Sequence, residues 1–242
     1  MFENLLQILG LSAFSLKGFG PLLLLGAWMT VKLSVLSLLL SALLGLIGAS
    51  FKLSRSAVLR VPAQLYTTLI RGVPDLVLML LIFYSLQNLL TSLTTALGWG
   101  YIEIDSFSAG VITMGGIYGA YFTETFRGAI LAVPRGQMEA ATAYGMTRFQ
   151  RFIFVVFPQM MRVALPGIGN NWMVILKATA LVSIIGLADL VKVAQDAGKS
   201  TYQLFYFLIL AALIYLLISS ASNYVLRRLA TFYAAGSREA MR

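Results

Sequence analysis

Long apolar runs alternate along this chain with short stretches that gather its charges. A helix needs about 20 mostly apolar residues to cross a lipid bilayer. A helical lead-in from Pro62 precedes the second of the runs that meet this requirement. The pattern predicts an all-α membrane protein with five transmembrane helices, over Pro21–Ser50, Val73–Leu90, Phe107–Val133, Gly167–Leu187 and Leu204–Leu226.

Basic side chains are concentrated in alternate connections between these runs. The connection after the second run has Glu103 and Asp105 but no lysine or arginine, and the one after the fourth mixes both signs. Cytoplasmic loops carry an excess of Lys and Arg, so the N-terminus is predicted outside and the C-terminus in the cytoplasm. The basic groups after the first, third and fifth runs are Lys52, Arg55 and Arg60; Arg135, Arg148, Arg151 and Arg162; and Arg227, Arg228, Arg238 and Arg242.

Composition strengthens the membrane assignment and narrows the chemistry. Of 242 residues, 59% are hydrophobic and 11% charged, with a mean hydropathy of +0.85, whereas soluble domains carry about 25% charged residues. Cysteine and histidine are both absent, which removes thiolate metal sites and the usual general base. We therefore expect no catalytic residue, metal site or bound cofactor. The net charge of +9 fits cytoplasmic loops better than a nucleic-acid surface.

The N-terminal residues differ from the remainder of the chain. Residues 1–20 are apolar but too short to span, and no basic stretch precedes their apolar run. We expect an interfacial helix on the outer face and no cleavable signal peptide. Residues 21–242 are expected to form one transmembrane domain.

The stretch Met138–Arg162 is basic, helix-prone and water-facing although it lies between apolar runs. Gly145 permits a sharp turn with positive φ, so two short helices broken near this residue are predicted. Two interpretations stay open: a helix lying along the lipid interface and a docking element for a cytoplasmic partner. After the turn, apolar residues recur at helical spacing: Phe149, Phe152, Ile153, Val156 and Phe157.

Glu139-Ala140-Ala141 is followed after three residues by Gly145, and nine residues later by Val155-Val156-Phe157-Pro158. This spacing resembles that of the permease subunits of ATP-binding-cassette (ABC) importers. The family pattern has Ile for Val155 and Leu for Phe157. Strings such as "TTLIRGVPDLVLMLLIFY" and "ALPGIGNNWMVILKATALVS" resemble the polar amino-acid branch, and within it the permeases of histidine/lysine-arginine-ornithine importers. The resemblance covers most of the chain beyond about residue 20.

The resemblance implies a type I ABC importer permease fold in the bacterial inner membrane. Residues 134–166 would then hold the coupling helix, which seats in a cleft of an ATP-binding subunit. The implied partners are two ATP-binding subunits that use the ATP, a periplasmic amino-acid-binding protein, and a second homologous permease or a copy of this chain. The chain itself has no phosphate-binding loop. The residues implied in ATPase coupling are Glu139, Ala140, Ala141, Gly145, Arg148 and Pro158.

Polar residues within the apolar runs are candidates for substrate contact, because ionisable groups are costly at membrane depth. Asp75 follows the break Gly72-Val73-Pro74, where irregular backbone can line a cavity. It is a candidate for binding a cationic side chain, although Asp is also favoured at a helix N-terminus. Lys177 could bind the substrate carboxylate or neutralise Asp75. The further candidates are Tyr118, Tyr121, Thr125 and Asn170, for which packing, capping or gating are the alternatives.

Arg71 and Glu124 are predicted to lie at similar depth, about a helical turn nearer the cytoplasm than Asp75. Either charge alone would be uncompensated, so a structural ion pair between them is expected, with ligand contact as the alternative. Lys32 lies near mid-depth without an evident partner, and its role stays open.

Together these features predict the permease subunit of an importer for basic or polar amino acids: histidine, arginine, lysine and ornithine. An ABC permease for a neutral polar amino acid such as glutamine, or for opines, is an alternative. A secondary transporter in which Asp75 and Glu124 titrate is a second alternative, and a non-transporting scaffold a third.

Overall fold

The computed structural model describes residues 16–234, so most of the predicted N-terminal interfacial segment lies outside the described residues. The described chain is all-helical. Its elements are α2 (Gly20–Lys52), α3 (Ala57–Gly72), α4 (Asp75–Ala96), α5 (Ser106–Leu131), α6 (Arg135–Ala143), α7 (Arg148–Arg151), the π-helix η2 (Phe152–Val156), α8 (Phe157–Val182), the 3₁₀ helix η3 (Ser183–Ile185), α9 (Leu190–Thr201) and α10 (Leu204–Ala234).

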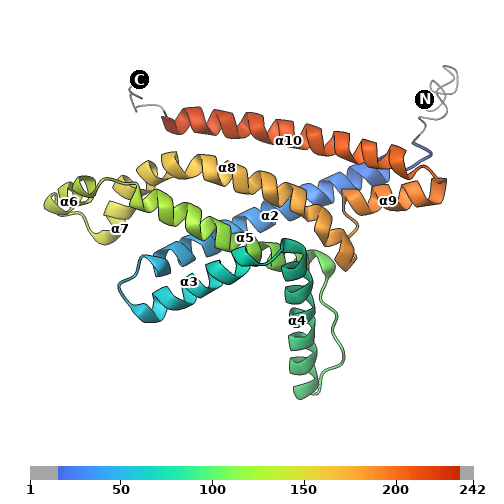
Figure 1. The fold of residues 1–242 in the computed structure, drawn as a ribbon, viewed down its shortest axis with the longest axis horizontal. Helices are drawn as coiled ribbons and strands as arrows, with labels where there is room; N and C mark the ends of the chain where they lie inside the picture. Colours follow the sequence, from blue (N-terminus) through green and yellow to red (C-terminus); the bar gives the residue numbers. More distant parts are fainter. Residues whose placement is uncertain (1–15, 235–242) are drawn as a thin grey trace.

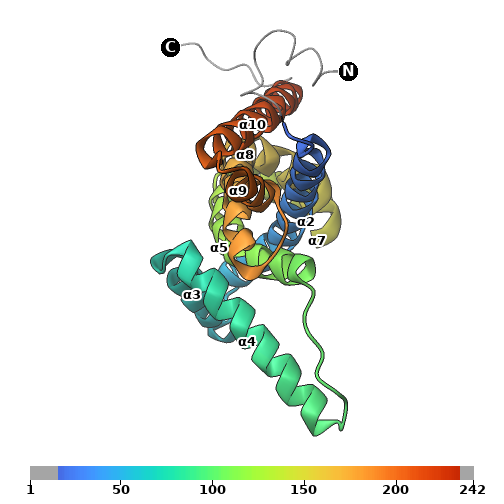
Figure 2. The ribbon, with the colours of Figure 1, turned by 90° about the vertical axis from the view of Figure 1, so that its right-hand side faces the viewer.

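The helices α2, α5, α8 and α10 run alongside one another and form the body of the molecule (Figure 1). α2 packs most extensively against α5, and α8 contacts both α5 and α10. α6 and α7 project at one end of this bundle, and α9 packs against α2 and α10 at the other. α4 leaves the bundle and touches it mainly through α5, as Figure 2 shows from a second side.

Four helical segments are long and apolar enough to cross a membrane: Gly20–Lys52, Asp75–Ala96, Arg148–Ile185 and Leu204–Thr231. They confirm four of the five predicted spans in outline. The remaining prediction, Phe107–Val133, corresponds to α5, which is helical but less apolar than the others. Much of α5 is buried among neighbouring helices, and a helix in that position needs less lipid-facing apolar surface than its neighbours do.

Small residues let α2 and α5 approach closely. A Cβ added at Gly45 of α2 would lie 2.9 Å from the Phe122 carbonyl carbon of α5, and one added at Gly48 would meet the Thr123 side chain. On α5, a Cβ at Gly119 would lie 3.0 Å from the Leu44 side chain. Close backbone packing of this kind is typical of helices associating in lipid.

Gly45→Val is expected to separate α2 from α5, because the clash involves backbone that cannot rotate away. The expected cost exceeds the roughly 1–3 kcal/mol of ordinary overpacking. Limited proteolysis and size-exclusion chromatography of the purified complex measure the loss. Gly128→Val is the matched control, since a Cβ at this position of α5 meets nothing within 4 Å. Normal assembly of the Gly45 variant would contradict the proposed packing.

A buried carboxylate anchors α9. Asp189 is 0% exposed, and its Oδ1 accepts a 2.9 Å hydrogen bond from the Lys192 N–H. Its Oδ2 accepts none from the described residues. Nearby, the Leu190 N–H donates to Thr30 Oγ1 of α2 at 3.2 Å. Burial raises the pKa of Asp189 from 3.8 to about 6.

Asp189→Asn should therefore change how stability depends on pH. The folded state binds the Asp189 proton more tightly than the unfolded chain does, so stability from this group falls as pH rises from about 4 to 6. Asparagine keeps the helix cap without a charge. The variant should gain up to about 3 kcal/mol at pH 7.5 and little at pH 4.5. Thermal unfolding at both pH values tests this, with the exposed Asp196→Asn as control; parallel profiles for Asp189→Asn and the unsubstituted protein would refute it.

Candidate functional site

The water-facing stretch forms two short helices, as predicted. α6 begins after Pro134, and it ends where the Tyr144 N–H bonds to the Ala140 carbonyl. Gly145 follows with φ +74°, the left-handed conformation that terminates helices and favours glycine. Thr147 then caps α7 in a reciprocal pair of hydrogen bonds with Gln150. The predicted break at Gly145 is confirmed.

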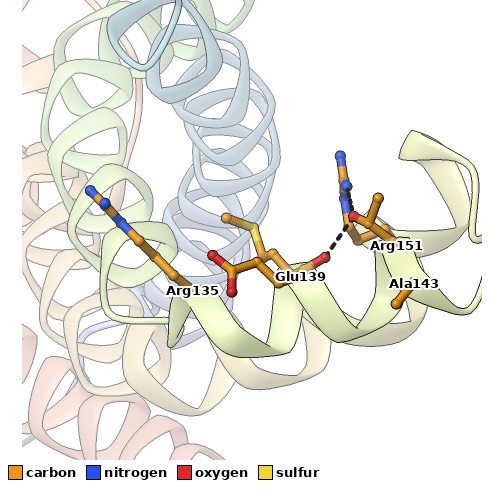
Figure 3. Close-up of a pocket in the computed structure, with 6 residues that line it drawn as sticks. Arg135, Glu139, Ala143 and Arg151 are labelled. Atoms are coloured by element: carbon orange, nitrogen blue, oxygen red, sulfur yellow. Dashed lines mark hydrogen bonds between the residues drawn. The ribbon is translucent and has the colours of Figure 1, made fainter.

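Residues of α6 and α7 line a cavity of about 500 Å³ that is open to the outside. Glu139 lies on its wall between Arg135 and Arg151, as Figure 3 shows. Arg151 Nη1 donates a 2.5 Å hydrogen bond to Thr142 Oγ1 and so ties α7 to α6. Glu139 forms no ion pair with the described residues and is exposed. The pair thus presents a free carboxylate beside basic groups at the tip of the molecule.

Pro158 does not interrupt the helical path, which runs from Arg148 through α8 to Ile185. It lies in the first turn of α8, directly after η2. Just before it, the π-helix η2 widens the turn, and the Phe157 N–H bonds to the Phe152 carbonyl five residues back. The apolar residues of this region only partly pack inward: Val156 is buried, while Phe149 is 73% exposed.

The Asp75 side chain is held against α5. Asp75 is the first residue of α4, where the positive end of the helix favours a carboxylate. Its Oδ2 accepts a 2.9 Å hydrogen bond from the Tyr118 hydroxyl. Tyr118 is 1% exposed, so α5 fixes the carboxylate from the protein interior.

Tyr118 and Tyr121 connect Asp75 with Arg71. The ring centroids of Tyr118, which bonds to Asp75, and Tyr121 lie 5.7 Å apart. The Arg71 guanidinium lies 5.6 Å from the Tyr121 ring centroid. The structure therefore brings Asp75, Tyr118 and Tyr121 together as predicted, and adds Arg71 to them.

The predicted Arg71–Glu124 ion pair is not formed. Glu124 Oε1 accepts from Lys52 Nζ, and Oε2 accepts from Arg127 Nε at 2.9 Å, so both carboxylate oxygens are occupied by other cations. Lys52 also donates to Thr67 at 2.8 Å. Arg71 and Glu124 nevertheless line the same polar cavity of about 450 Å³ between α2, α3 and α5.

The remaining predicted site residues separate into two groups. Thr125 lies near Asn171, whose Nδ2 donates to Thr125 Oγ1 at 3.2 Å. Asn170 and Lys177 line cavities shared with α10, on another face of α8, so the structure does not bring them to Asp75. The helical phase explains the split, because Gly167 and Asn171 are the residues that turn toward α5.

Sequence reasoning missed partners that depend on packing. Lys52 reaches Glu124 only because the end of α2 lies beside α5. The pair between Glu124 and Arg127 could have been predicted, since residues three apart share a helix face. Lys32, left without a partner, lies 5.8 Å from the Phe107 ring centroid, a cation–π contact.

The structure has the features of an integral membrane protein: apolar helices of membrane-spanning length, a polar site at α3, α4 and α5, and a helix pair that projects from one end. The crystal structure of an amino acid ABC transporter with histidines matches it with a TM-score of 0.73, at 34% identity over 87% of this chain and 94% of that one. An inward-facing methionine ABC transporter, MetNI, shares the fold with a TM-score of 0.66 at 19% identity over 86% of this chain and 96% of that one.

Sequence comparison gives the family. The model of the binding-protein-dependent transport system inner membrane component matches residues 41–233. The histidine/lysine/arginine/ornithine transport system permease protein HisQ of Escherichia coli (strain K12) is 57% identical, over 93% of this chain and 99% of its own length. The nopaline transport system permease protein NocQ of Agrobacterium fabrum is 43% identical, over 85% of this chain and 88% of its own. The chain belongs to the binding-protein-dependent transport system inner membrane component family and is an ABC transporter permease subunit with the type I fold.

Proposed function

We propose that this permease moves basic amino acids, namely histidine, arginine, lysine and ornithine, inward across the bacterial inner membrane. The strongest support is Asp75, a carboxylate held by Tyr118 that forms no ion pair with the described residues. A fixed and unneutralised carboxylate at membrane depth favours a cationic ligand. The name of the 57% identical relative supports the same substrates.

In the membrane, we propose five crossings with the N-terminus outside and the C-terminus in the cytoplasm. α5 supplies the fifth crossing: its 26 residues measure about 39 Å at the usual helical rise. The alternation of basic and acidic connections supports the orientation. Residues 21–242 then form one transmembrane domain, and α6 and α7 lie on the cytoplasmic side.

The driving force would come from partner subunits. A permease of this family works with ATP-binding subunits and a binding protein; we propose two ATP-binding subunits, a periplasmic amino-acid-binding protein and a second permease, either homologous or a copy of this chain. Residues 134–166 would form the coupling region, with Glu139 and the Gly145 turn seated in the ATPase. Closure of the ATPases would open the site outward, and reopening after hydrolysis would release substrate inward.

Competition for uptake tests the proposed substrates. The complete complex in vesicles, supplied with its binding protein and internal ATP, is given radiolabelled arginine with excess unlabelled histidine, lysine, ornithine, glutamine or nopaline. Histidine, lysine and ornithine should compete, whereas glutamine should not. Competition by glutamine at equal concentration would favour a neutral amino-acid permease, and competition by nopaline alone would favour an opine permease.

A further inference from the structure

We infer that Arg71 binds the α-carboxylate of the transported amino acid while Asp75 binds its cationic group. This inference rests on the proposed function and assigns a role there to a residue whose expected partner was Glu124. Arg71 is exposed and forms no ion pair with the described residues. Its guanidinium lies 5.6 Å from the centroid of the Tyr121 ring, and this contact leaves its planar set of N–H donors available.

The surrounding cavity has an excess of positive charge. Its lining includes Lys52, Arg71 and Glu124 together with the hydroxyl side chains of Thr67 and Thr68. Lys52 and Arg127 occupy both oxygens of Glu124. Of the two cations that line this cavity, Lys52 is therefore paired, whereas Arg71 is available to bind a ligand. A carboxylate matches the planar donors of its guanidinium, which can bind both oxygens at once.

Helix geometry explains why Arg71 and Asp75 coexist without neutralising each other. Arg71 lies in the last turn of α3, where the negative end of the helix stabilises a cation. Asp75 lies in the first turn of α4, where the positive end of the helix stabilises an anion. The extended residues Val73 and Pro74 separate the two helices. Each charge is thus supported by its own helix.

A pair of tyrosines connects the two charges. Tyr121 contacts the Arg71 guanidinium with its ring, and this ring lies 5.7 Å from that of Tyr118, whose hydroxyl donates to Asp75. A cation and an anion at the two ends of this tyrosine pair are complementary to a ligand that carries both a carboxylate and a cationic group. Lys177 cannot supply this pairing from the cavity that it shares with Tyr215 and α9.

Removing the ligand carboxylate and the Arg71 charge in turn tests the inference. Equilibrium binding of L-arginine and of agmatine, its decarboxylated analogue, is measured on the complete complex in nanodiscs without the binding protein. Arg71→Gln should weaken arginine binding about 10- to 100-fold, the range of a charge-assisted hydrogen-bonded pair, and leave agmatine binding unchanged. Arg71→Lys should recover part of the loss, because lysine keeps the charge but not the fork.

Lys177→Gln is the matched control and should leave both affinities unchanged. If agmatine binds the unsubstituted complex too weakly to measure, L-arginine methyl ester takes its place. Three results would overturn the inference while leaving the proposed substrate intact. In the first, Arg71→Gln weakens the binding of arginine and of agmatine equally, and in the second it does not weaken arginine binding. In the third, it is Lys177→Gln that removes the preference for arginine over agmatine. An unsubstituted complex that binds neither arginine nor histidine would contradict the proposed function itself.

Discussion

Gly145→Val should abolish uptake while the protein stays in the membrane. Gly145 has φ +74°, and a β-branched residue is strongly disfavoured in this left-handed conformation. A Cβ at this position meets nothing within 4 Å, so steric overlap does not contribute and the cost lies in the backbone turn itself. Loss of the turn would reorient α6 relative to α7 and misplace Glu139 and Arg151.

Uptake and ATP hydrolysis by the reconstituted complex measure this effect together. We expect uptake to fall at least about 100-fold, because a misplacement of even 1 Å in a preorganised contact can cost that much. ATP hydrolysis should no longer respond to the loaded binding protein. Gly136→Val is the matched control, since this glycine of α6 also has open space at Cβ but no positive φ. Full uptake by the Gly145 variant would remove the turn from the coupling mechanism.

Asp75→Asn should cost most of the transport of basic amino acids. Asparagine can still accept a hydrogen bond from Tyr118, so the local packing is kept while the negative charge is lost. A charge-assisted contact with the ligand is typically stronger than its neutral counterpart, and about a 10- to 100-fold loss of arginine uptake is expected. Radiolabelled uptake at saturating binding protein measures the change.

The control for this variant is Asp196→Asn, which removes an acidic group that is exposed and paired with Lys192. It should transport normally. Unchanged arginine or histidine uptake in Asp75→Asn, with a neutral amino acid moved equally well, would show that Asp75 serves only the start of α4. In that case the cationic specificity would have to come from the binding protein.

Apolar run length predicted the helices that face lipid, and the structure agrees on α2, α4, α8 and α10. Helix boundaries were less predictable. α8 begins at Phe157, ten residues before the predicted Gly167. Pro158 lies in its first turn, directly after the π-helix η2. Proline alone cannot distinguish a helix start from a helix end, since both positions tolerate it.

The candidate site was predictable where it depended on one helix and a nearby break. Tyr118 and Tyr121 share a face of α5 by spacing alone, and Asp75 followed from the break before α4. The phase of α8 was not predictable: Asn171 and not Asn170 meets Thr125. The partner of Glu124 depended on α2 lying against α5, a contact that the glycines of α5 allow but do not specify.

An ATP-driven importer and an ion-coupled transporter differ in the energy source of uptake. The complete complex is reconstituted in vesicles with its binding protein outside, and arginine uptake is measured with ATP inside, with a non-hydrolysable analogue, and with ATP plus an uncoupler and a sodium ionophore. We predict uptake that requires hydrolysable ATP and survives collapse of the ion gradients. Uptake that continues without hydrolysis and stops when the gradients collapse would identify an ion-coupled transporter and contradict the account.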